Sequence, residues 1–302
     1  MSEKSESLRK EINNKIIDSL NKNNIPWAVP WASDNNSGFP KNITSKKGYS
    51  GINPLLLLIT SWSRNYKSRW WGTYKQWQDL GLKVKKRPNN IPNGEWGTNI
   101  VFYSPFEVDE TKKDGTVIKK KIFFLKSYTV FNAEQIEGEG INNYLPIMDN
   151  QVPNLVDLNF DAADEFIKST GAAITHGGNS AHYTRPFPYG SWPKHMSGDT
   201  ITLPVIQHFF DTTEYYITAF HELAHWAEVR LDWEGTYEMG ELIAEISACY
   251  LASELQIPNR NFNNHAKYLS SWLSKMKDDT QFIFKASTQA SKVVDYLLSF
   301  KV

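Results

Sequence analysis

The most regular alternation of apolar and polar positions in this chain lies between residues 211 and 233. Apolar side chains recur there at the three- and four-residue spacing of one helix face, at Tyr216, Phe220, Leu223 and Ala227. Asp211 and Glu214 have the spacing of a helix N-cap and its capping-box partner. Because no proline interrupts residues 212–233, the pattern predicts one helix over that range.

A second, nearly continuous apolar pattern follows at residues 239–249. Its apolar members are Leu242, Ile243, Ala244, Ile246, Ala248 and Cys249. A helix with so few polar positions is typical of a buried element. Glu241 and Glu245 lie four residues apart within it, so their carboxylates share one helix face. Buried carboxylates need partners, which makes both glutamates candidates for a functional site.

The first half of the chain mixes helical and strand patterns. Helices are predicted over residues 8–23, 53–62 and 73–80. Asn53 is the expected cap of the second, with Pro54 at its first position, and Gly81 is the expected end of the third.

Strand patterns occur in both halves. Strands are predicted over residues 99–103 and 122–131, with a turn at Asp114-Gly115 between them. Thr200–Leu203 alternates polar and apolar residues and stops at Pro204, as an edge strand would. Helices and strands together predict an α+β fold.

Charge and residue usage divide the chain into two parts. Residues 1–150 hold 22 Lys and Arg against 15 Asp and Glu, a net charge of +7, and residues 151–302 hold 11 against 18, a net of −7. All seven histidines lie in the second part, and seven of the eleven tryptophans in the first. We therefore predict two domains, over residues 1–140 and 141–302, the first α+β and the second mainly helical with a small sheet.

The sequence His-Glu-x-x-His lies within the predicted helix of residues 212–233. His221 and His225 are four residues apart on one helix face, so both imidazoles can bind one metal ion. Glu222 then lies beside the metal, placed to take a proton from water and to return it to a leaving amine. This set of groups indicates metal-dependent hydrolysis of an amide.

A catalytic zinc ion usually takes three protein ligands. Glu241 is the favoured third ligand, because it lies in the first turn of the next helix. Glu245 is the alternative ligand, or the carboxylate that holds a ligating histidine by its second ring nitrogen. The imidazole and carboxylate donors suit Zn²⁺, with Mn²⁺ or Ni²⁺ as substitutes. His182, Tyr183 and His195 are candidates for the donor that stabilises the oxyanion, and the sequence does not choose among them.

Basic and aromatic residues alternate in the first half in a manner typical of single-stranded nucleic-acid binding, in which cations follow the phosphates and flat rings stack on bases. The candidate contacts are Lys46, Lys47, Tyr49, Arg69, Trp70, Trp71, Lys83, Lys85, Lys86 and Arg87.

Cys249 is the only cysteine, so no internal disulfide forms and a reducing compartment suits the chain. Residues 1–24 lack the apolar core of a signal peptide, and the longest apolar run, Pro54–Ile59, is too short to cross a bilayer. These features predict a cytoplasmic protein without a membrane partner.

Several short motifs occur in a fixed order along the chain. In the first half they are Pro26-Trp27, Pro30-Trp31, Gly48–Asn53, Trp71–Gln76 and Val130–Gln135. In the second half they are Tyr215-Tyr216, the His-Glu-x-x-His sequence with Trp226, Glu241–Glu245 and Asn264–Tyr268 before Trp272. This ordered set resembles the ArdC antirestriction family, whose members are carried by plasmids and phages.

The resemblance implies a single-stranded-DNA-binding domain followed by a zincin-like metallopeptidase domain of the gluzincin type. It also implies that the protein shields incoming DNA from restriction in a bacterial host cell. The expected partners are single-stranded DNA and a protein substrate, such as a restriction component or a DNA-associated protein. The alternative is a non-catalytic shield with a structural or vestigial metal site. Glu222 favours the enzyme, because a structural metal site needs no general base. The opposite net charges further suggest that, without DNA, the basic half covers the cleft of the acidic half.

Overall fold

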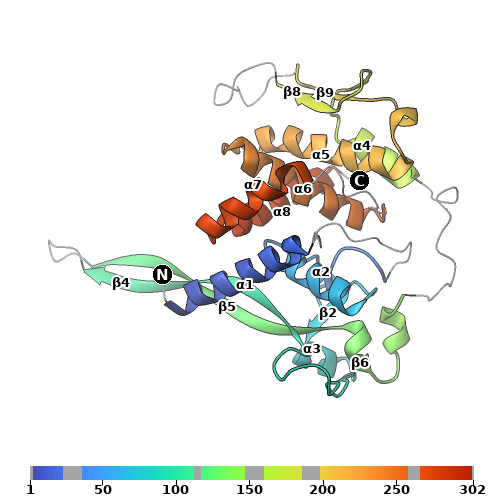
Figure 1. The fold of residues 1–302 in the computed structure, drawn as a ribbon. Helices are drawn as coiled ribbons and strands as arrows, with labels where there is room; N and C mark the ends of the chain where they lie inside the picture. Colours follow the sequence, from blue (N-terminus) through green and yellow to red (C-terminus); the bar gives the residue numbers. More distant parts are fainter. Residues whose placement is uncertain are drawn as a thin grey trace.

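The computed structural model describes residues 3–22, 36–111, 117–146, 160–185, 198–257 and 266–300. An N-terminal part is built around a sheet and a C-terminal part around a group of helices, which confirms the predicted two-domain α+β architecture (Figure 1). The motifs Pro26-Trp27 and Pro30-Trp31 lie outside the described residues. Within the described part of the chain, no helix has both the length and the apolar character that a membrane crossing requires.

The N-terminal sheet consists, in spatial order, of β1 (Lys41–Asn42), β2 (Trp70–Thr73), β5 (Val117–Asn132) and β4 (Thr98–Thr111). β1 runs parallel to β2, whereas β2 and β4 are antiparallel to β5. The β4–β5 hairpin projects from the side of the molecule (Figure 1). Both strands extend beyond their predicted ranges, and Asp114-Gly115 lies outside the described residues. A two-stranded ladder pairs β3 (Lys83–Val84) with β6 (Ile136–Glu137), and the short helices η1 (Ala133–Gln135) and η2 (Ile141–Tyr144) flank β6.

The predicted helices of the first half are present as α1 (Glu3–Asn21), α2 (Asn53–Arg64) and α3 (Tyr74–Asp79). Asn53 does not cap α2, because its side-chain amide instead pairs with the main chain of Val101 on β4, at 2.9 and 2.8 Å. Asn53 therefore fastens the helix to the edge of the sheet. Thr73 and Gln76 form the capping box of α3.

The C-terminal part contains α4 (Asp161–Ser169), α5 (Thr212–Arg230), α6 (Tyr237–Glu254), α7 (Ala266–Asp278) and α8 (Phe282–Leu298). Asp211 caps α5 as predicted, accepting a hydrogen bond from Glu214 N at 3.0 Å. The Glu214 carboxylate accepts from Phe210 N, at 3.1 Å. The helix ends before Trp233, because Asp232 takes a left-handed conformation with φ of 53° and turns the chain toward α6.

A small sheet of β7 (Ile174–His176), β9 (Thr200–Leu203) and β8 (His182–Thr184) lies against α5, and η4 (Ile206–His208) leads into that helix. The prediction that Thr200–Leu203 is an edge strand is wrong: β9 is the central strand, parallel to β7 and antiparallel to β8. Pro204 follows the last paired residue, so it removes no donor from the ladder. β8 is an edge strand of this sheet and contacts α5.

The two parts share one apolar core and a polar joint. Buried residues of α1 and α2 belong to the same cluster as those of α5, α6 and α8. At the joint, Glu254 of α6 pairs with Lys41 Nζ at 2.7 Å and with Arg69 Nη2 at 3.0 Å. Ser291 of α8 accepts from Gly51 N at 2.8 Å. The N-terminal part therefore contacts α6, which carries Glu241, and α8, which packs against α6.

Candidate metal centre

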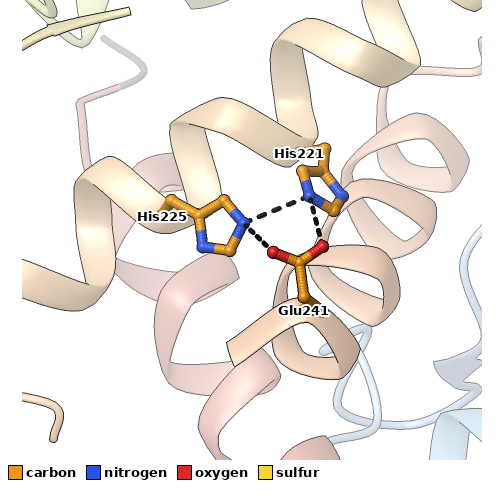
Figure 2. Close-up of side chains that lie close together, drawn as sticks. All are labelled: His221, His225 and Glu241. Carbon is orange, nitrogen blue, oxygen red and sulfur yellow. Dashed lines mark hydrogen bonds and ion pairs between the residues drawn. The ribbon is translucent and has the colours of Figure 1, made fainter. Parts of the chain in front are cut away.

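Helices α5 and α6 bring the three predicted metal ligands to one point (Figure 2). The Nε2 atoms of His221 and His225 lie 3.1 Å apart. Oxygens of the Glu241 carboxylate lie 3.8 Å from His221 Nε2 and 3.5 Å from His225 Nε2. The two imidazoles face Glu241 because they occupy successive turns of one face of α5, against which α6 packs.

The donor set fits a divalent metal ion of the zinc type. In a tetrahedral site with bonds of about 2.0–2.2 Å, neighbouring donor atoms lie roughly 3.3–3.6 Å apart. The observed separations of 3.1, 3.5 and 3.8 Å bracket that range. One donor atom from each residue can be chosen so that all lie within 4.8 Å of one another. Three protein ligands leave the fourth tetrahedral position for water or substrate.

Glu245, the alternative ligand, lies behind His221. Its Oε1 atom is 3.7 Å from His221 Nδ1, the nitrogen that faces away from Glu241. A carboxylate in this position orients the imidazole and raises its basicity. The geometry therefore favours Glu241 as the ligand and Glu245 as the group that holds His221.

Glu228 lies in the same way behind His225, and it was not among the predicted residues. His225 Nδ1 donates to Glu228 Oε2 at 3.2 Å, and Glu228 is only 1% exposed. Because Nδ1 is engaged by Glu228, Nε2 is the nitrogen that faces His221 and Glu241, and it can bind a metal ion once its proton is lost. The sequence did hold a signal, because Glu228 follows His225 by three residues, the spacing of neighbours on a helix face.

The pKa values at this cluster follow from burial and from the pairing of histidines with carboxylates. Burial acts to lower the pKa of His225, but hydrogen bonds to Glu228 and Glu241 outweigh it and raise that pKa to about 10. Burial acts to raise the pKa of Glu241, yet the two histidines hold it below its ordinary value. In the metal-free protein His225 therefore carries protons on both ring nitrogens at neutral pH. A metal ion must displace one of these protons, so metal binding should tighten as the pH rises.

Replacing Glu228 by glutamine is expected to weaken metal binding about tenfold or more, because the charge that supports His225 is lost. Competition with a chromogenic chelator measures the affinity. Glu234→Gln, an exposed carboxylate in the loop after α5, is the matched control and should bind metal like the wild type. Equal affinities for the Glu228 and Glu234 variants would show that other contacts hold the His225 ring.

A cleft of about 590 Å³ opens beside the three ligands. Its walls come from β8 and the residues next to it, from α5 and from the start of α6, and include His182, Arg185, Glu222 and Tyr237. Glu222 is 7% exposed and lines this cleft, as a general base must. The described residues that line the cleft all lie between positions 181 and 241. Contrary to the prediction, the described residues of the basic half do not line the cleft, and they contact α6 and α8 elsewhere, at Glu254 and Ser291.

The structure separates the three candidate oxyanion donors. The His182 side chain is exposed and lines the cleft. The Tyr183 hydroxyl donates to Asp199 Oδ2 at 2.8 Å, and Arg230 Nη1 binds the same oxygen at 2.7 Å. Through Asp199, the Tyr183 hydroxyl links β8 to Arg230 of α5, so it is not free to act as an oxyanion donor. Burial together with Asp199 raises the pKa of Tyr183. His195 lies outside the described residues.

Three of the predicted DNA contacts are buried, which corrects their assignment. Trp71 is 0% exposed and Tyr49 and Arg69 are each 8% exposed. Adjacent residues of a strand point to opposite faces, so Trp71 enters the core when Trp70 faces outward. Tyr49 donates to the Trp71 carbonyl, and Arg69 pairs with Glu254. These side chains stabilise the sheet and the joint. Because they are buried, they are not available for contact with DNA.

The other predicted DNA contacts are accessible. Lys46, Lys47, Lys83, Lys85 and Lys86 are exposed, whereas Trp70 and Arg87 are half-buried. Arg87 Nη1 donates to the main chain of Ile91 and so closes its own loop.

Comparison with known proteins gives a match for each half. Residues 6–131 match the N-terminal domain of anti-restriction factor ArdC. Residues 161–289 match a zincin-like metallopeptidase family.

Two crystal structures of the antirestriction protein ArdC from the R388 plasmid are similar to this chain, with 32% sequence identity and 97% of both chains covered. The TM-score is 0.73 for the metal-free structure and 0.69 for the Mn(II)-bound structure. Each structure therefore matches this chain over nearly its whole length.

Curated relatives extend the comparison. A DNA primase TraC of Escherichia coli is 32% identical over 95% of this chain, which spans 19% of that relative's length. The uncharacterized protein y4eC of Sinorhizobium fredii is 29% identical over 95% of this chain and 90% of its own length.

Proposed function

Because this chain belongs to the ArdC antirestriction family, we propose that it protects incoming DNA from restriction in the bacterial cytoplasm by combining single-stranded-DNA binding with metal-dependent cleavage of a protein. The convergence of His221, His225 and Glu241 beside Glu222 carries this proposal. Zn²⁺ is the proposed resident ion. The Mn(II)-bound structure of the R388 relative supports binding of a divalent metal.

A bound divalent ion would supply Lewis acidity to a peptide carbonyl and to the attacking water. Glu222 would accept the proton of that water and deliver it to the leaving amine. His182, at the open edge of the cleft, would donate to the carbonyl oxygen as negative charge develops there. The main chain of β8, at an edge of the sheet, would pair with an extended substrate.

The test of the enzymatic part is hydrolysis of an unstructured protein, such as casein, by the zinc-loaded chain. Fragments should appear with zinc, disappear with a chelator and return when zinc is restored. A preparation that contains one equivalent of zinc and cleaves neither casein nor itself would contradict the proposal.

For the DNA part, we expect steeply salt-dependent binding of single strands by the exposed lysines. Reversing the charge of Lys83, Lys85 and Lys86 together should remove three phosphate contacts. The slope of log affinity against log salt should then flatten by roughly 2, at about 0.7 per contact. Fluorescence anisotropy with a labelled oligonucleotide measures both slopes. The control is the same change at Lys275, Lys285 and Lys292 of α7 and α8. Equal slopes for the two triple variants would show that the lysines at and after β3 do not form the DNA-binding surface.

A further inference from the structure

The N-terminal part contains a small aromatic box formed by Trp70 of β2 and Tyr144 of η2. The two rings meet edge to face, with their centroids 6.4 Å apart. Lys46 fills this box: its Nζ atom lies 4.6 Å from the Trp70 centroid and 5.0 Å from the Tyr144 centroid. Tyr144 was not among the predicted DNA contacts, because 74 residues separate it from Trp70 in the chain.

Hydrogen bonds hold the Trp70 ring and the Tyr144 main chain, and the Tyr144 ring packs edge to face against Trp77, with centroids 6.0 Å apart. Trp70 Nε1 donates to Asn36 Oδ1 at 2.7 Å, and Asn36 Nδ2 donates to the Leu145 carbonyl at 3.0 Å. Ser68 Oγ donates to the Tyr144 carbonyl at 2.7 Å. The rings are therefore in place before any ligand arrives, and little conformational entropy is lost on binding.

The lysine in the box is the movable part. Lys46 has a left-handed backbone with φ of 60°, in a tight turn closed by Asn42, which donates from its main chain to the Lys47 carbonyl at 2.9 Å. The turn fixes the Lys46 backbone, while its exposed side chain can leave the rings by rotation of its own bonds. Burial against the rings lowers the pKa of Lys46, so the contact also desolvates the ammonium group.

Two further exposed lysines, Lys47 and Lys85, are linked to residues of the aromatic box. Lys47 adjoins Lys46 in the same turn and is exposed. Lys85 Nζ donates to the Glu134 carbonyl at 2.9 Å, and the Glu134 carboxylate accepts from Ser68 N, also at 2.9 Å. Ser68 is the residue that holds Tyr144. We expect the phosphates next to a bound base to contact lysines of this group.

We propose that the aromatic box is a stacking site for one unpaired nucleobase, and that Lys46 occupies it until a single strand binds and then moves to an adjacent phosphate. The inference rests on the proposed single-stranded-DNA binding. Stacking of a base on an aromatic ring is stronger than an exposed cation–π contact, and Lys46 regains a charged partner when it leaves. The site reads no sequence, since every base has a flat face.

The test compares two ligands on the full-length protein: a labelled oligothymidylate and an abasic oligonucleotide of equal length. Trp70→Ala should weaken binding of the oligothymidylate about tenfold and leave the abasic strand almost unchanged. Tyr144→Leu should act in the same direction and provides a second variant if Trp70→Ala fails to fold. Trp62→Ala, an exposed tryptophan of α2, should change neither affinity.

Lys46→Met separates charge from stacking. It should lower the salt slope for both strands by roughly 0.7, the share of one phosphate contact, while the preference for the oligothymidylate over the abasic strand persists. If Trp70→Ala and Tyr144→Leu keep the wild-type preference, the aromatic box is not a stacking site, although DNA binding stands. If the wild type binds neither strand, the proposed DNA-binding function is wrong, and so is the proposed stacking site.

Discussion

Replacing His221 by alanine is expected to leave the purified protein with less than about a tenth of an equivalent of tightly bound metal, because a zinc site with two protein ligands loses most of its affinity. The reason is geometric: His221 Nε2 lies 3.1 Å from His225 Nε2 and 3.8 Å from Glu241, and no other imidazole of the described residues joins this cluster. Metal analysis of wild-type and variant protein by mass spectrometry measures the stoichiometry.

Two comparisons sharpen that result. Glu241→Ala should lose more metal than Glu245→Ala, because Glu245 approaches only the Nδ1 side of His221. The reverse order would exchange the roles of the two glutamates. His208→Ala, an exposed histidine of η4, should keep a full equivalent. A full equivalent in His221→Ala would contradict the assigned metal centre.

Glu222→Gln is expected to lower the rate of protein hydrolysis by about 10²–10⁴-fold, the usual contribution of a general base. The amide keeps the size of the carboxylate but accepts no proton from water. Because Glu222 is not one of the three converging ligands, the variant should retain its metal. The measurement pairs initial rates on casein with metal content in the same preparation.

The control for this variant is Glu234→Gln, which changes an exposed carboxylate in the loop after α5. It should hydrolyse casein like the wild type. A Glu222→Gln protein that is fully loaded with metal and fully active would show that another group of the cleft takes the proton.

The sequence predicted the parts of the site that depend on local spacing. The four-residue interval between His221 and His225 and the cap at Asp211 belong to one helix, so the sequence alone locates them. Glu241 was assigned because the next buried helix had to cross the first. Glu228 was equally local, and its three-residue spacing from His225 was a signal that could have been used.

Features that depend on distant contacts were not predictable. Trp70 and Trp71 look alike in the sequence, and only the pairing of β2 with β5 determines which of them is buried. Arg69 was assigned to DNA because its partner Glu254 lies 185 residues away. The central position of β9 likewise depends on β7 and β8, which no local pattern places beside it.

The most direct test of the central claim, that protection depends on catalysis at the metal centre, is transfer of unmodified DNA into a restricting bacterial host that makes either the wild type or Glu222→Ala. Purified samples of both proteins must first show equal metal content and equal affinity for single strands. We predict that the wild type protects the DNA and that Glu222→Ala, present at the same level, does not. Equal protection by the two proteins would contradict this account and assign the effect to occupancy of DNA by a non-catalytic shield.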